Sequence, residues 1–404
     1  MKIFHPKVVQ KIIGTLILIL VYILVSKIPL PFVDISKSLS VGGATQGLQL
    51  TAAMMGGNLR SMSFISVGLS PWMSSMLLWR MFEIADKSLV KQKAMELQGR
   101  WQMYLTLIIA LIQSLAISLN LTYRADIQGD IALLSTTVLL VTGAFFLIWL
   151  VDLNSIFGIG GSVTLIIIGI LSNIPTDLAS TMKELNLGWS FLLLLAVISL
   201  LLLYITVFVE KSKYRIPVHK TMIRNSFKDF SYIDIKINPS GGMPFMYAMT
   251  IVQIPVYVLL IAKVFMPRAK WIVPAIQELA MGKLLWFLIY AATIFILALA
   301  FAFINIDARK IAKQMQRSGE FIDHVYPGED TRKYILSILS KFALLGAIYV
   351  MLFAVLPMSM ALIDPLLLRI SMIPGIFLMF FGMVFTVQDE LRAITVNEQY
   401  KKIL

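Results

Sequence analysis

The sequence predicts an all-α polytopic membrane protein with ten transmembrane helices, and three observations lead to this fold class. Hydrophobic residues make up 58% and charged residues 14% of the 404 residues, whereas soluble domains hold about 45–50% and about 25%. The mean hydropathy is +0.84. The apolar residues gather in segments close to the roughly 20 residues that a helix needs to cross a bilayer. These segments are Ile12–Ile28, Ser61–Phe82, Met103–Tyr123, Ile131–Val151, Gly161–Ile174, Leu187–Val209, Met243–Phe265, Leu284–Ile304, Phe342–Leu362 and Leu366–Val387.

Two apolar segments near the N-terminus need separate assignment. The first follows three lysines and therefore reads either as a cleavable signal peptide or as a retained helix. No small-x-small cleavage site follows Val25, because Lys27-Ile28-Pro29 comes next, so we interpret it as the first retained helix. Gly47–Arg60 is too broken and too short to cross, and it predicts a half-inserted, re-entrant segment.

Basic residues give the expected orientation, because cytoplasmic loops carry an excess of lysine and arginine. With the N-terminus inside, the cytoplasmic segments hold 25 of the 35 basic residues and 15 of the 22 acidic ones, a net charge of +10. The opposite side holds 10 basic and 7 acidic residues, a net charge of +3. The sequence therefore predicts a cell-membrane protein with both termini in the cytoplasm.

Two cytoplasmic segments, about 210–242 and 307–333, are longer than a turn requires. Ser231–Asn238 alternates with the period of a strand, which predicts a small hairpin. Ala308–Arg317 reads as a helix that ends at Ser318-Gly319, where glycine can adopt the left-handed cap conformation. These segments are either solvated connectors or docking sites, and their length and basic charge favour docking.

The residues that carry chemistry are missing from the expected spans. The chain has no cysteine and only three histidines, His5, His219 and His324, far apart in the sequence. No ionisable residue lies near the middle of a span, which disfavours a coupled transporter or an intramembrane protease. Gly158-Ile-Gly160-Gly161 lacks the remaining features of a nucleotide loop and predicts a helix start instead. We therefore expect no enzymatic activity, catalytic residue, cofactor or metal, and no nucleic-acid partner.

Glycine pairs predict two halves, residues 1–185 and 186–404. Gly56-Gly57 opens the second span and Gly241-Gly242 opens the seventh, each the second membrane element of its half. One enters from outside and the other from inside, as in pseudo-symmetric inverted repeats of five helices each. Further kinks are expected at Pro71, Pro244 and Pro255. The pattern indicates a pathway between two halves that can part, although glycine and proline are common in membrane helices.

Five stretches of the chain, in order, resemble the SecY family of protein-conducting channels. Gly56–Ser75 matches its Gly-Gly-x-Leu-x-x-x-Ser-x-x-x-x-Gly-x-x-Pro run, and Ile237–Pro244 is similar to its Ile-Asn-x-x-Gly-x-x-Pro motif. The other three stretches are Val207–Ile216, Arg317–Phe321 with Pro327–Thr331, and Asn397–Tyr400. The resemblance implies the central channel subunit of a protein translocase, with a re-entrant plug.

Departures from the family pattern resemble the accessory paralogue of Gram-positive bacteria. Tyr326 stands where the housekeeping form has an arginine, and Gly158–Ser162 departs from Gly-Ile-Gly-Asn-Gly. The resemblance implies the export of preproteins, which for the accessory paralogue are serine-rich-repeat glycoprotein adhesins. The implied partners are a SecA-type ATPase motor, small SecE/SecG-like subunits, accessory secretory proteins, the exported preprotein and the lipid bilayer. A housekeeping channel for general secretion stays open as an alternative.

The resemblance implies a channel closed by an apolar ring and a plug. The ring residues are Leu69, Met73, Ile166, Ile170, Met246 and Met379. An apolar constriction can block ions by dewetting, and methionine would make it adaptable. Leu69 with Met73, and Ile166 with Ile170, are apolar i,i+4 pairs that share a helix face. Pairs of this kind also occur in the ordinary packing of membrane helices. The plug spans about 47–61 and contains Met54, Met55, Gly56 and Gly57.

The resemblance also implies a lateral gate and a docking surface. The gate lies between Ser74 and Leu77 of the second span and Thr250 and Ile254 of the seventh. The implied motor-docking residues are Lys211, Lys213, Arg215, Arg309, Lys313, Arg317 and Tyr326.

Two other classes remain from the residues alone. A secondary transporter would need polar groups at the hinges, and only Ser66, Ser74, Thr250 and Gln253 are available. A lipid flippase or scramblase is compatible with the composition, but the five motifs argue against it.

Overall fold

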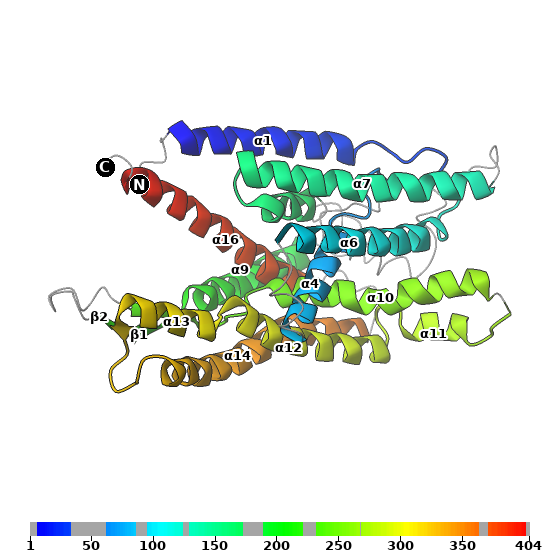
Figure 1. Cartoon of the computed structure of the whole chain (residues 1–404). Coiled ribbons are helices and arrows are strands. Elements are labelled where there is room, and N and C mark those ends of the chain that lie inside the picture. Colours follow the sequence, from blue (N-terminus) through cyan, green and yellow to red (C-terminus); the bar gives the residue numbers. More distant parts are fainter. Residues whose placement is uncertain are drawn as a thin grey trace. The chain divides into compact units, whose positions relative to one another are not determined.

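The computed structural model describes residues 6–33, 62–85, 95–123, 129–172, 189–220, 232–266, 268–362 and 371–400. The expected plug, with Met54, Met55, Gly56 and Gly57, lies outside the described residues. The chain forms two units, whose elements are labelled in Figure 1. Unit 1 comprises residues 1–184, 249–287 and 383–404, and unit 2 comprises residues 185–248 and 288–382.

Unit 1 is a set of helices packed through close glycine contacts. Its helices are α1 (Pro6–Ser26), α4 (Ser70–Ala85), α6 (Met95–Ser118), α7 (Gly129–Phe157), the short helix Gly161–Ser172 and α11 (Ile272–Glu278), with parts of α10, α12 and α16. α1 and α7 lie side by side (Figure 1) because Gly14 has no side chain to hold off the Phe157 carbonyl. Gly143 of α7 likewise packs on the backbone of Phe64. Small residues at such contacts are the usual device of membrane helix pairs.

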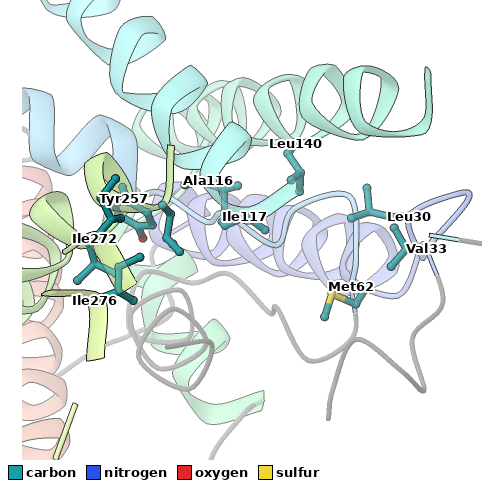
Figure 2. Packing of buried hydrophobic residues seen from close by; sticks show 12 residues of the cluster. Leu30, Val33, Met62, Ala116, Ile117, Leu140, Tyr257, Ile272 and Ile276 are labelled. Carbon is teal, nitrogen blue, oxygen red and sulfur yellow. The ribbon is translucent and has the colours of Figure 1, made fainter. Parts of the chain in front are cut away.

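The apolar core of unit 1 joins segments that are far apart in the sequence. Leu30 and Val33, just after α1, cluster with residues of α6 and α7 and with Met62. The same cluster includes Tyr257 of α10, which Figure 2 shows beside two isoleucines of α11. The short α11 therefore contributes two buried apolar side chains, Ile272 and Ile276, to this core.

Unit 2 contains the four strands found among the described residues. Its helices are α9 (Trp189–Lys211), α13 (Ala308–Ser318), α14 (Glu329–Met358) and the 3-10 turn η2 (Ser359–Leu362). Three helices are shared between the units: α10 (Met243–Phe265), α12 (Leu284–Asn305) and α16 (Ile373–Tyr400). Of these, α10 belongs to unit 2 as far as Ala248 and to unit 1 from Met249 onward.

Seven helices in the described part of the chain are long and apolar enough to cross a membrane. The seventh expected span has the predicted bounds, Met243–Phe265, with Pro255 inside the helix. The ninth and tenth are longer than predicted, because α14 begins at Glu329 and α16 continues to Tyr400. In both cases polar residues extend the helix beyond its apolar stretch, and hydropathy alone does not register them.

The prediction for the second span was wrong at its N-terminus. Residues 62–69 form turns, and α4 begins at Ser70. Ser63 forms an isolated β-bridge with Pro29, and Met62 and Gly68 have positive φ angles of 44° and 68°, which a helix does not allow. Pro71 therefore lies in the first turn, where proline's missing amide has no helical partner to lose, and it is not a mid-helix kink.

The two long polar segments pack together into one structure, which we call the platform. β1 (Lys213–Pro217) pairs antiparallel with β3 (Tyr232–Lys236), which confirms the predicted strand, although β2 lies between the two in sequence and so they are not a simple hairpin. β2 (His219–Lys220) pairs with β4 (Glu320–Phe321) and so joins residues 210–242 to residues 307–333. Beneath these strands lies an apolar cluster of Ile216, Val218, Ile235, Ala308, Met315, Ile322 and Ile335. The predicted α13 is confirmed, with Gly319 as a left-handed C-cap at φ 67°.

Candidate functional site

The expected ring residues of unit 1 are all buried. Met73 of α4 donates its backbone amide to the Leu69 carbonyl at 3.0 Å, so the two side chains lie one turn apart. Ile166 and Ile170 occupy successive turns of helix Gly161–Ser172. All four side chains are at most 6% exposed, which is consistent both with a constriction and with ordinary packing.

The expected ring residues of unit 2 lie where α10 begins. Met246 in the first turn of α10 and Met379 of α16 are buried. A Cβ at Gly242 would lie 2.6 Å from the Leu378 carbonyl oxygen and 2.6 Å from the Met379 Cα. The start of α10 therefore rests directly on the backbone of α16, and only glycine permits this contact.

The four expected gate residues all belong to unit 1. Ser74, Leu77 and Thr250 are buried, and Ile254 is half-buried. The Ser74 hydroxyl donates to the Ser70 carbonyl at 2.7 Å, and the Ser66 hydroxyl donates to the Ser63 carbonyl at 2.6 Å. These two hydroxyls use their donors on their own backbone, which weakens the case for a polar solute site at these positions.

The glycine run after α7 starts a helix, as predicted, and four side chains hold it in place. Asn154 donates its side-chain amide to the carbonyls of Ile159 at 3.1 Å and Gly161 at 2.8 Å. The Ile159 amide donates to the Thr15 hydroxyl at 2.9 Å, and Thr164 donates its hydroxyl to the Ile159 carbonyl at 2.7 Å.

A carboxylate from α16 completes the contacts of this glycine run. The Gly160 amide donates to Glu390 Oε2 at 2.9 Å. An acidic group at the start of a helix is stabilised by the free amides and the dipole there. Sequence analysis missed Glu390 and Asn154. For Asn154 the sequence did offer a signal, because a polar residue shortly before the glycine run Gly158–Gly161 can hydrogen-bond to its backbone.

A second carboxylate, also missed, is buried where α9 ends. Glu210 is 5% exposed, and its Oε1 accepts a hydrogen bond from Asn238 Nδ2 at 3.0 Å. Burial raises the pKa of Glu210, while the nearby charge of Lys236 and the Asn238 amide act in the opposite direction. Glu210 and Asn238 both lie in stretches that resemble the SecY family, but nothing in the sequence indicated that the two side chains pair.

The basic residues of the platform differ in how they are paired. Asp234 accepts from Lys213 at 3.1 Å and lies 3.7 Å from the Arg215 Nε. The Arg215 guanidinium also lies over the Tyr232 ring at 4.5 Å. Arg309 and Lys313 form no ion pair within the part of the chain that the structure describes. Among the described residues the same holds for Lys310 and Arg317 of α13, so this helix carries unpaired positive charge along its length.

Arg309 and Lys313 line a pocket of about 290 Å³ between α13 and α14. The other lining residues are Ala312, Gln316, Gly328, Glu329 and Arg332. Glu329 is already held by Arg332 at 2.6 and 2.9 Å. The pocket thus presents two free cations to an incoming anionic group.

The expected tip residue, Tyr326, is exposed just before α14. Its ring is 80% exposed. Its carbonyl accepts hydrogen bonds from the Thr331 hydroxyl at 2.9 Å and from the Thr331 amide at 3.2 Å. Backbone contacts therefore fix the turn, while the aromatic ring is free to meet another surface.

These features define a multi-pass α-helical membrane protein with long apolar helices and a polar platform. The fold is similar to a solved structure described as that of a protein conducting channel, with a TM-score of 0.69 and 14% identity over 96% of this chain and 93% of that one. A model of the SecY family matches residues 63–387. The chain belongs to the SecY family.

Two curated relatives match almost end to end, and both are accessory Sec system protein translocase subunits SecY2. The protein of Streptococcus sanguinis (strain SK36) is 49% identical over 403 residues, which cover 99% of each chain. The protein of Streptococcus salivarius (strain CCHSS3) is 44% identical over 400 residues, which cover 99% of this chain and 98% of the relative.

Proposed function

We propose that this protein is the central channel subunit of an accessory Sec translocase and exports preproteins across the cell membrane. The observation that carries the proposal is the 49% identity over 99% of both chains to a SecY2 subunit. The cargo would be serine-rich-repeat glycoprotein adhesins, moved by a SecA-type motor with SecE/SecG-like subunits and accessory secretory proteins. The channel itself performs no chemistry, because the motor supplies the energy.

The proposed architecture has ten spans in two inverted halves, residues 1–185 and 186–404, with both termini in the cytoplasm. Its support is the excess of basic residues on one side. The segment at about 47–61 would be the plug. The gate would open between α4 and α10, so that a signal sequence could reach lipid.

Reconstitution tests the proposed function. Proteoliposomes with this chain, its accessory motor and a serine-rich-repeat substrate should protect that substrate from added protease when ATP is supplied. A housekeeping preprotein in parallel distinguishes the general channel, and uptake of a small solute without the motor would instead indicate a secondary transporter. Failure to protect either substrate would contradict a channel function.

Replacing the two methionines of the proposed ring is expected to open a leak. Met73 and Met246 are both buried, and exchanging them for glycine removes the side chains that would keep a closed pore dry. The ion current of planar bilayers containing the Met73→Gly, Met246→Gly chain should rise at least tenfold. Met358, buried in α14 and outside the ring, gives a matched Met358→Gly control. An unchanged current would assign the two methionines to packing alone.

Charge reversal in the platform pocket is expected to weaken motor binding. Arg309→Glu with Lys313→Glu turns the two α13 cations that line the pocket into anions, which should lower affinity about tenfold or more at low salt. Lys310→Glu on the same helix lies outside the pocket lining and is the matched control. Binding of the purified motor to nanodiscs measures the effect, and equal affinities for the two variants would refute docking at the pocket.

A further inference from the structure

The segment before α10 is fixed by a buried pair of polar side chains. Glu210 lies in the last turn of α9 and is 5% exposed, and Asn238 precedes α10 and is 1% exposed. Asn238 Nδ2 donates to Glu210 Oε1 at 3.0 Å, and the Ser240 hydroxyl donates to Asn238 Oδ1 at 2.9 Å. The carboxylate, the amide and the hydroxyl form a chain of hydrogen bonds from the last turn of α9 to the segment just before α10.

Two further helices hold the same segment within unit 2. Asn305, the last residue of α12, donates its side-chain amide to the Pro239 carbonyl at 3.0 Å. Gly346 of α14 lets Asn238 approach, since a Cβ there would lie 3.0 Å from Asn238 Oδ1. Gly241 turns the chain at φ 62°, with room for the Glu210 carboxylate beside it. The start of α10 is thus positioned by contacts on several sides.

A buried carboxylate is a costly way to fill this space. Desolvation penalises its charge, and an apolar side chain of similar size would pack at lower cost. A directional hydrogen bond fixes position and orientation in a way that apolar contact does not. The pair is therefore better explained by the position that it imposes on α10 than by stability.

We propose that Glu210 and Asn238 form a latch that fixes the first turns of α10 and keeps the channel closed. The closing role rests on the proposed function, whereas the latch itself is a property of unit 2. Glu210 and Asn238 are positioning residues, because they act through α10 and Met246 rather than on the cargo. Releasing the latch frees the unit 2 end of α10, the helix proposed to form the gate.

Hydrogen–deuterium exchange on the whole protein in nanodiscs tests the latch without motor or cargo. Glu210→Leu and Asn238→Asp should each raise the exchange rate of the Tyr247–Met249 amides about tenfold, as expected for loss of a buried hydrogen bond to a charged group. Combining Glu210→Gln with Asn238→Asp reverses donor and acceptor at the same side-chain lengths and should restore slow exchange. Asp234→Asn on exposed β3 is the control and should leave these amides unchanged.

The same variants test whether the latch keeps the channel closed to ions. The single variants should also pass an ion current at least tenfold above the unmodified chain, and the double variant should return it to baseline. Three results would overturn the proposal: unchanged exchange at Tyr247–Met249, a rise spread evenly over α12 and α14, or faster local exchange without current. Loss of export in reconstitution with normal exchange would instead count against the proposed function.

Discussion

Cysteines placed at Leu77 and Ile254 are expected to form a disulfide that abolishes export. The chain contains no cysteine, so any crosslink reports only the introduced pair. Leu77 lies on α4 and Ile254 on α10, the two helices between which a signal sequence would leave the channel. A disulfide forms only when the two Cα atoms approach to about 4.4–6.8 Å, and it would then hold the gate shut.

The measurement combines electrophoresis with export. Oxidised Leu77→Cys, Ile254→Cys protein should lose at least nine-tenths of its export in proteoliposomes, and a reductant should restore it. Each single cysteine variant is a control for the substitution itself. If no disulfide forms under oxidation, the gate does not lie between these residues.

The sequence predicted helices best where apolar runs have clear ends. The bounds of α10 and the polar helix α13 with its glycine cap were confirmed. The strand period of Ser231–Asn238 was sufficient to predict β3. In each case the signal is local, because it depends on spacing within one element.

Contacts between distant segments could not be predicted in the same way. β2 and β4 are two residues long, too short for any periodicity, so the joining of the two platform segments left no pattern in the sequence. Ser63, in the turns before α4, forms a bridge with Pro29, a contact that only the folded chain reveals.

Two carboxylates, those of Glu210 and Glu390, could not be identified as structural contacts from the sequence. Glu210 and Glu390 lie just beyond apolar stretches, where charges also occur for topology alone. Only the folded structure brings Asn238 to Glu210 and Gly160 to Glu390. In both places a carboxylate accepts from the glycine-containing segment that precedes a helix, 238–242 before α10 and 158–160 before Gly161–Ser172. Glycine lets the backbone approach closely, and the carboxylate then fixes where it lies.

Replacing Gly242 with valine is expected to destabilise unit 2 strongly, because α10 and α16 touch at this glycine. A Cβ at this position would lie 2.6 Å from both the Leu378 carbonyl oxygen and the Met379 Cα, well inside van der Waals contact. These are backbone atoms and cannot rotate away, so α10 and α16 must separate. A Cβ added at Gly382 of α16 would lie 3.2 Å from the Gly242 amide nitrogen. The two backbones are therefore in close contact at this second position as well.

Overpacking of this kind typically costs about 1–3 kcal/mol, and separating the two helices would also displace Met246 and Met379. Gly242→Val protein should therefore unfold at a lower temperature in detergent and export little in proteoliposomes. Gly99→Ala in α6 is the matched control, because no atom lies within 4 Å of its new Cβ. Alanine also has the higher helix propensity, so this variant should be at least as stable as the unmodified chain. An unchanged melting temperature for Gly242→Val would mean that α10 does not rest on α16 through this glycine.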